Sequence, residues 1–243
     1  MKHLVYCVLR DAEPARGVAA AGVEGSRVSL MAEDGLAAAF SLVPETCLAP
    51  SVSRAAAYAR VVQVFHETAT VLPFRYGCFL EDAGAVVELL RARRREFRES
   101  LEELDGCVEM GVRVLLSGRD SATCRKSSHA PNLSSARAYL ADRKTHYVRK
   151  DGDDEESVAA TEKVRQAFKD LVVKSEAETS CTDGRRLVSV FFLVPRDNVG
   201  RFHTTFRQLQ GRGPQGMLVT GPWPPYSFAC RYSVQRPHGV SAP

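Results

Sequence analysis

The chain has 243 residues, which is long enough for one large domain or two domains of ordinary size. Its hydrophobic content of 44%, its charged content of 26% and its modest net charge of +4 are typical of a soluble globular protein and do not indicate a nucleic-acid partner. No apolar run approaches the roughly 18 residues that cross a bilayer, and the first residues lack the apolar stretch of a signal peptide, so we expect a cytoplasmic protein without a membrane span.

The first half of the chain predicts a small sheet with two helices. Apolar or alternating runs of strand length occur at residues 4–9, 27–31, 36–43, 71–77 and 108–116. The pair Asp34-Gly35 separates the second run from the third and is a strong hairpin signal. Apolar residues at helical spacing predict helices over 53–69 and 83–104. We expect a ferredoxin-like variant, in which a small, mostly antiparallel sheet carries the helices on one face.

The second half predicts a further α/β domain. Residues 118–132 are polar and contain glycine, proline and serine, which indicates a linker. The expected elements that follow are a helical hairpin of 134–149 and 157–175, a strand at 187–194, a helix at 196–209, and strands at 217–220 and 228–234. The fold class is therefore α+β with two domains. The expected boundaries are an N-terminal domain 1–117, a linker 118–132, a C-terminal domain 133–236 and a flexible tail 237–243.

A stiff corner near the C-terminus, residues 218–228, contains the only tryptophan and three of the twelve prolines. Each proline fixes φ and removes a backbone donor, so this backbone loses little conformational freedom on folding. The corner is either a structural lock that caps the core or a docking surface with rigid aromatic anchors. Residue chemistry by itself favours the lock, because large aromatic side chains are usually buried. The candidate residues are Pro222, Trp223, Pro224, Pro225, Tyr226 and Phe228.

A second set of candidates has structural roles. Glu109 and Arg113 share one face of a predicted strand with Gly111 between them, which indicates either a charged site that another backbone approaches or an ion pair at the rim. We favour the ion pair. Arg75 lies between two aromatic residues and is expected to stack on a ring or to anchor the neighbouring loop. The full set is Pro73, Arg75, Gly77, Glu109, Gly111 and Arg113.

The sequence contains no recognisable catalytic motif. None of the six histidines has metal-ligand spacing with a partner, and no phosphate-binding loop or nucleophile elbow occurs. The arginines between Arg91 and Arg98 alternate with glutamates, which favours an ion-paired helix face over a nucleic-acid surface. We therefore expect no catalytic residue, no cofactor, no metal and no nucleic-acid partner.

The cysteines are scattered and never form a C-x-x-C pair, which argues against a zinc site and against a secreted disulfide framework. We expect reduced thiols, several of them buried as small hydrophobic side chains. The seven are Cys7, Cys47, Cys78, Cys107, Cys124, Cys181 and Cys230.

Several of these segments resemble a known family, the gas vesicle protein GvpL/GvpF family. Val71–Gly77 and Leu104–Val114 resemble its N-terminal hallmarks, and Ala138–Arg143 resembles its central helix. Phe191–Val194 and Thr220–Phe228 resemble its C-terminal motifs, of which the last is the most specific because it is long and rich in rare residues. The similarity spans nearly the whole chain in the right order.

The resemblance implies a non-enzymatic accessory or minor structural protein of gas vesicle assembly, located at the gas vesicle or in the cytoplasm. It implies binding to the small hydrophobic shell protein and to other gas vesicle accessory proteins, so that vesicle formation is nucleated or chaperoned. A shell subunit exposes apolar surface before it assembles, and a rigid aromatic corner or an exposed sheet edge could cover that surface. The alternative is a cytoplasmic enzyme with a cysteine–histidine site in a cleft between the domains.

Overall fold

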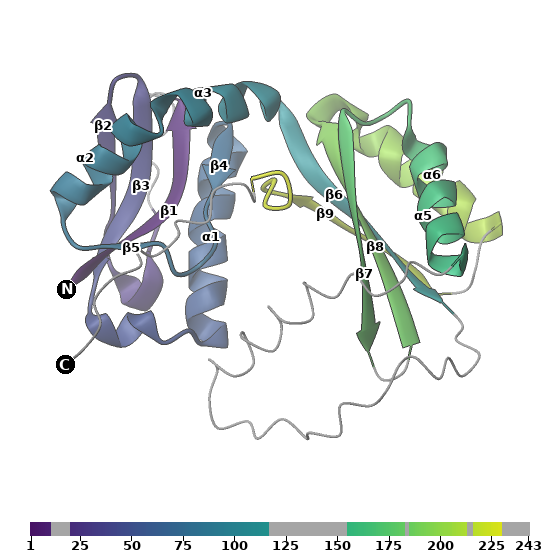
Figure 1. Cartoon of the computed structure of the whole chain (residues 1–243), viewed down its shortest axis with the longest axis horizontal. Coiled ribbons are helices and arrows are strands. Elements are labelled where there is room, and N and C mark those ends of the chain that lie inside the picture. Colours follow the sequence, from purple (N-terminus) through teal and green to yellow (C-terminus); the bar gives the residue numbers. More distant parts are fainter. Residues whose placement is uncertain (11–19, 117–154, 183–184, 213–215, 230–243) are drawn as a thin grey trace. The chain divides into compact units, whose positions relative to one another are not determined.

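The structure is a computed structural model that describes residues 1–10, 20–116, 155–182, 185–212 and 216–229. These residues divide into two compact units (Figure 1). Among the described residues, the first unit contains 1–10, 20–48, 52–103 and 228–229, and the second contains 49–51, 104–116, 155–182, 185–212 and 216–227. None of the described helices combines the length and the apolar character that crossing a membrane requires.

The first unit is built on an antiparallel sheet in the order β2-β3-β1-β4, with β5 also paired to β1. The bounds are β1 Lys2–Arg10, β2 Val28–Glu33, β3 Leu36–Val43, β4 Val71–Pro73 and β5 Phe79–Leu80. Strands β2 and β3 form the hairpin that the Asp34-Gly35 pair predicts.

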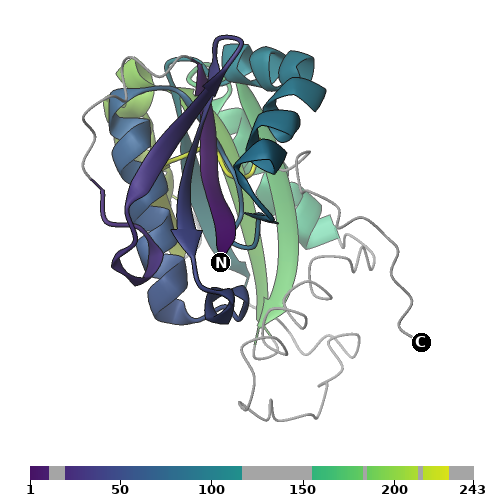
Figure 2. The same ribbon diagram turned by 90° about the vertical axis from the view of Figure 1, so that its left-hand side faces the viewer.

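Helices cover both faces of this first sheet. The helical elements are α1 Val52–Thr68, α2 Ala83–Ala92, α3 Arg94–Glu103 and the short turns η2 Val23–Gly25 and η3 Glu45–Leu48. Every residue of β1 from Leu4 to Leu9 is fully buried. Since successive side chains of a strand point to opposite faces, both faces of β1 must be covered. Figure 2 shows α1 on one side of the strands and α2 with α3 on the other, which differs from the expected arrangement with all helices on one face.

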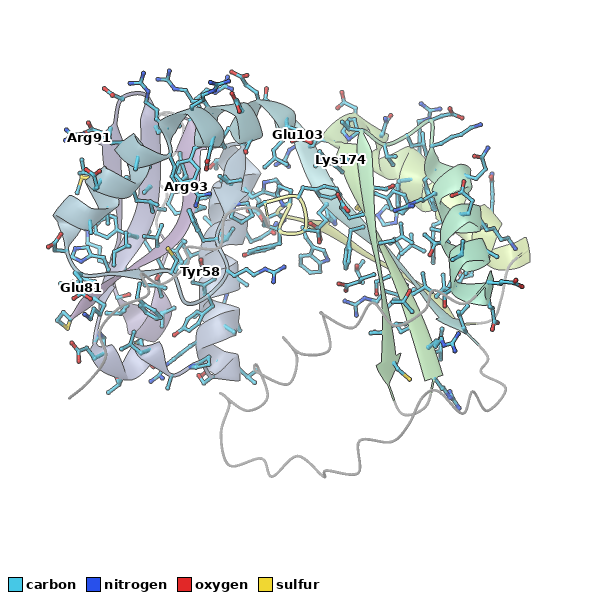
Figure 3. All side chains as sticks on the ribbon, viewed as in Figure 1. Tyr58, Glu81, Arg91, Arg93, Glu103 and Lys174 are labelled. Atoms are coloured by element: carbon cyan, nitrogen blue, oxygen red, sulfur yellow. The ribbon has the colours of Figure 1, made fainter. Side chains whose placement is uncertain are left out.

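The hydroxyl of Tyr58 joins α1 to the sheet. Tyr58 is labelled in Figure 3. Its hydroxyl lies 2.9 Å from the carbonyl oxygen of Val5, 3.1 Å from that of Tyr6 and 3.0 Å from that of Phe74. Its ring also packs on the ring of Tyr6, with the centroids 4.9 Å apart. One buried side chain therefore fixes the position of α1 against β1 and the residue after β4.

The predicted helix over 83–104 is two helices that divide at Arg93. The arginines of this region form ion pairs, as their alternation with glutamates predicts, and several of them reach the β2–β3 hairpin. Arg91 pairs with Glu33, Arg94 pairs with Asp34, and Arg98 donates a hydrogen bond to the Asp34 carbonyl oxygen. Exposed pairs of this kind contribute about 1 kcal/mol at most, so they orient the helices more than they stabilise the unit.

The second unit contains an antiparallel sheet in the order β7-β8-β6-β9. Its elements are β6 Cys107–Leu116, α5 Glu155–Phe168, β7 Lys174–Thr182, β8 Arg185–Pro195, the turn η4 Arg196–Asn198, α6 Val199–Arg212 and β9 Met217–Trp223. The described elements thus follow the order strand, helix, strand, strand, helix, strand, which is the ferredoxin-like order. The α+β class with two sheets is confirmed, but the ferredoxin-like sheet is in the second unit and was expected in the first.

Strand β6 explains this difference. The strand predicted over 108–116 was assigned to the first domain, yet it pairs along its length with β8 and also with β9. The division between the units falls after Glu103 and not at the expected boundary of 117. The expected linker 118–132, the helix over 134–149 and the tail 237–243 lie outside the described residues.

Strand β7 was not predicted. Helix α5 ends at Phe168, whereas the sequence predicted a helix as far as residue 175. From Lys174 onward the chain is extended and pairs with β8 over nine residues. Strand β7 is an outer strand of the sheet, and its sequence is mostly polar. It therefore lacks the apolar alternation from which a strand is predicted.

The core of the second unit lies between the sheet and its two helices. Alternate residues of β6 enter it, together with Phe168 of α5, Phe192 of β8 and Phe202 of α6. The residues of β6 in this core are Val108, Met110, Val112, Val114 and Leu116. The residues between them, including Glu109 and Arg113, therefore point to the opposite face of the sheet.

Candidate partner-binding corner

The aromatic corner, residues Gly221–Ser227 of the second unit, begins within the last three residues of β9 and passes close to β6. In the β6–β9 register Thr220 lies opposite Gly111 and Trp223 lies opposite Glu109, so that β9 contains one extra residue. A Cβ atom added to Gly221 would lie 2.6 Å from the carbonyl oxygen of Glu109, and the φ angle of Gly221 is +111°. Only glycine meets both conditions without strain.

Glu109 holds the far end of the same segment. Its Oε2 atom accepts a hydrogen bond of 2.7 Å from the backbone N–H of Ser227, and its Oε1 atom accepts one of 3.0 Å from the Ser227 hydroxyl. Glu109 is only 6% exposed. A buried carboxylate is costly unless it is hydrogen-bonded, and hydrogen bonds to a charged acceptor are about twice as strong as neutral ones. The contact therefore anchors the corner to β6.

The corner turns Trp223 outward while its central prolines turn inward. Trp223 is 51% exposed, and Pro222 beside it is also exposed. Pro224 and Pro225 are buried, and the backbone N–H of Tyr226 donates to the carbonyl oxygen of Pro224 at 2.8 Å. Tyr226 and Phe228 are both half-buried. The corner thus combines a packed base, as the lock interpretation expects, with one exposed aromatic ring, as the docking interpretation expects.

Gly111 and Arg113 lie beside this anchor on β6. A Cβ atom at Gly111 would lie 2.6 Å from the Thr220 hydroxyl oxygen, so the glycine leaves room for a side chain of the neighbouring strand. Arg113 is exposed and lies opposite Ser189 of β8 and Leu218 of β9. It lies four positions from Glu109, which corresponds to about 13 Å along the strand. Ser227 supplies the partner for Glu109 that Arg113 was expected to supply. Sequence reasoning missed Ser227 because it lies 118 residues from Glu109.

The other predicted residues lie in the first unit. Pro73 is the last residue of β4, is buried and pairs with Cys7 of β1. Arg75 and Gly77 are exposed residues of the turn that leads from β4 to β5. Between them, Tyr76 donates a hydrogen bond of 2.6 Å to the carbonyl oxygen of Cys47. These residues shape the turn between two strands.

The free cysteines of the described part of the chain do not resemble catalytic nucleophiles. Burial raises the pKa of each of their thiols, and it raises that of Cys78 to about 12. A nucleophilic cysteine requires the opposite shift, because the thiolate is the reactive form. The four residues concerned are Cys7, Cys47, Cys78 and Cys107.

Cys181 on β7 is different, because it is disulfide-bonded. The expectation that all thiols are reduced is therefore wrong at this residue. Within the described ranges no group of three or more histidine, cysteine, aspartate or glutamate side chains is placed to hold a metal ion.

The raised pKa of Cys78 predicts a loss of stability at alkaline pH. Its ordinary pKa is 9.0, and a group whose pKa rises on folding stabilises the folded state fully below the ordinary value and loses that contribution as pH rises toward 12. Burial also raises the pKa of the Tyr76 hydroxyl from 10.0 to about 12, which acts in the same direction. Urea unfolding at several values between about pH 8 and pH 11 is expected to show a falling free energy of unfolding. Cys78→Ala should make this fall shallower, and an unchanged slope would contradict the assignment.

The described residues define a two-unit α+β protein whose second unit has a ferredoxin-like sheet and an aromatic corner anchored to it. The chain belongs to the gas vesicle family described as Gas vesicle synthesis protein GvpL/GvpF, whose profile matches residues 2–230. The resemblance stated from the sequence motifs is thereby confirmed.

Individual relatives agree with this assignment. Gas vesicle protein F of Streptomyces sp. (strain CB03234) is 28% identical over 239 residues, which cover 94% of this chain and 99% of the relative. Gas vesicle protein L of the same strain is 29% identical over 248 residues, which cover 93% and 91%. Gas vesicle protein F2 of Halobacterium salinarum (strain ATCC 700922 / JCM 11081 / NRC-1) is 26% identical over 162 residues, and the match spans 66% of this chain but only 59% of that longer relative.

Two solved structures have the same fold. The crystal structure of the gas vesicle protein GvpF from Anabaena sp. PCC7120 superposes with a TM-score of 0.70 at 17% identity and covers 99% of both chains. That of GvpF from Microcystis aeruginosa gives a TM-score of 0.68 at 16% identity and covers 94% of this chain and 98% of its own. At these identities the similarity shows the fold alone.

Proposed function

We propose that the chain is a non-enzymatic accessory or minor structural protein of gas vesicle assembly that binds the small hydrophobic shell protein. In this role it nucleates or chaperones vesicle formation at the gas vesicle or in the cytoplasm, together with other gas vesicle accessory proteins. Membership of the family supports the gas vesicle role. The observation that carries the binding role is the half-exposed ring of Trp223 on a corner whose backbone is held at both ends.

A shell protein with a large apolar surface aggregates unless that surface is covered. Trp223 is 51% exposed and Leu218 is 55% exposed. Trp223 pairs with Glu109 of β6, and Leu218 pairs with Arg113. Glu109 and Arg113 are four residues apart, so their side chains point to the same face of the strand. Directly paired residues share a face, so Leu218 and Trp223 lie on the same side of β9. Because the corner is already ordered, little side-chain or backbone freedom is lost on binding. We therefore assign the apolar contact to this side of β9, with Trp223 at its centre.

The double variant Trp223→Ala/Tyr226→Ala tests the proposal. We expect it to lose co-purification with co-expressed shell protein while far-UV circular dichroism and the melting temperature of the purified chain remain close to those of the wild type. The matched control is Val173→Ala, which removes another exposed apolar side chain just before β7 and should co-purify normally. If the double variant unfolds, the corner is a structural lock. If it folds and still binds, the corner is not the contact surface.

Fractionation of gas vesicles distinguishes a permanent component from a transient helper. Purified floating vesicles should retain the chain if it is a minor structural protein. They should lose it on washing if it only assists assembly.

A further inference from the structure

We propose that Glu109 is the positioning residue of this surface: through Ser227 it fixes the direction in which Trp223 points, and in this way it sets the affinity for the shell protein. The binding part of this inference rests on the proposed function. The positioning part concerns the chain alone.

The geometry places both ends of the corner on one residue. At the first end the backbone of Gly221 passes so close to the carbonyl oxygen of Glu109 that no side chain fits between them. At the second end both carboxylate oxygens of Glu109 accept hydrogen bonds from Ser227. Only five residues, 222–226, lie between these two contacts, and Trp223 is one of them. A segment this short has little freedom when both of its ends are held.

Glu109 is also separate from the core of its unit. Its neighbours Val108 and Met110 enter the core between the sheet and the helices, so Glu109 points to the other face of β6. Removing its carboxylate should therefore release the corner without creating a cavity in that core. A buried polar group with only a structural role would change stability, whereas this one should also change the environment of Trp223.

The chain provides its own probe, because Trp223 is the only tryptophan. Its emission maximum and its quenching by acrylamide report the exposure of the corner without any partner. We expect Glu109→Ala to change the acrylamide quenching constant by about twofold, because the two charge-assisted hydrogen bonds that hold the corner are lost. Ser227→Ala keeps the backbone N–H donor and loses the hydroxyl donor, so it should give a smaller change.

Glu109→Gln is the conservative variant. Its amide can accept from the Ser227 N–H and donate to the Ser227 hydroxyl, so quenching should stay near the wild-type value. Ser189→Ala is the matched control, because it removes a buried serine hydroxyl from β8 on the same face of the sheet. It should leave the fluorescence unchanged.

The same variants are then compared for co-purification with co-expressed shell protein. We expect at least about a fivefold loss for Glu109→Ala, an intermediate loss for Ser227→Ala and near wild-type recovery for Glu109→Gln.

Unchanged quenching in both Glu109→Ala and Ser227→Ala would overturn the inference, and so would changed quenching with undiminished co-purification. If the wild-type chain itself fails to co-purify, the proposed function falls, while the quenching measurements still decide whether Glu109 positions the corner. If Glu109→Ala does not fold, Ser227→Ala and Glu109→Gln carry the test.

Discussion

Replacing Phe202 with alanine is expected to lower the free energy of unfolding of the second unit by about 3–5 kcal/mol. Phe202 is one of three fully buried rings in mutual contact, with its centroid 4.1 Å from that of Phe168 and 5.5 Å from that of Phe192. These rings come from α6, α5 and β8, so their contact joins both helices to the sheet. Truncation removes apolar burial and leaves a cavity that rigid neighbours cannot fill.

Urea unfolding followed by Trp223 fluorescence measures this effect, because Trp223 belongs to the same unit. The control is Val158→Ala, which truncates an exposed side chain of α5 and should change the free energy by no more than about 0.5 kcal/mol. A loss below about 1 kcal/mol in Phe202→Ala would mean that the three rings do not form the packed centre of this unit.

Gly221→Ala is expected to destabilise the second unit by about 2 kcal/mol or more and to shift the emission of Trp223. The new Cβ would lie 2.6 Å from the Glu109 carbonyl oxygen and 2.9 Å from the sulfur of Met110. The first of these atoms belongs to the backbone of a paired strand and cannot move away easily. The φ angle of +111° adds strain for any residue other than glycine.

Gly216→Ala separates the two effects. Gly216 lies in the same unit and has a similar φ angle of +105°. The closest atom to a Cβ added there would be the Cβ of Leu115, at 3.4 Å. It therefore carries the backbone strain without the severe clash. Chemical denaturation of both variants should show a larger loss for Gly221→Ala, and equal losses would show that the corner does not depend on its close approach to β6.

The elements that the sequence predicted correctly are those with strong local signals. Helix α1 spans Val52–Thr68 against an expected 53–69, and the Asp34-Gly35 pair does form a hairpin. The period-two alternation of β6 also corresponds to a strand with one face in a core. In each case the residues that define the element lie within a few positions of one another, so their spacing in the sequence is sufficient to predict the element.

The features that the sequence did not predict depend on residues far apart in the chain. Strand β7 is polar, and it is extended because it pairs with β8. The alternation in β6 indicates a strand, but it does not say that the neighbours of that strand are β8 and β9. As a result, the ferredoxin-like order was placed in the wrong half of the chain. The composition of the corner predicts a stiff segment, but it carries no sign of the anchor to Glu109, because Glu109 and Ser227 are 118 residues apart.

The outer strands of the second sheet limit which kinds of contact this protein can make with other chains. Strand β7 carries Lys174, Glu176 and Glu178, and charges on an outer strand discourage another chain from pairing with it. Strand β9 contains Pro222, which has no backbone N–H to offer to an incoming strand. Such a sheet resists the addition of a strand from another chain, so a protein that works among aggregation-prone shell subunits would not itself be drawn into an aggregate. Binding would then depend on exposed side chains, and a bound shell subunit could dissociate without breaking a series of backbone hydrogen bonds.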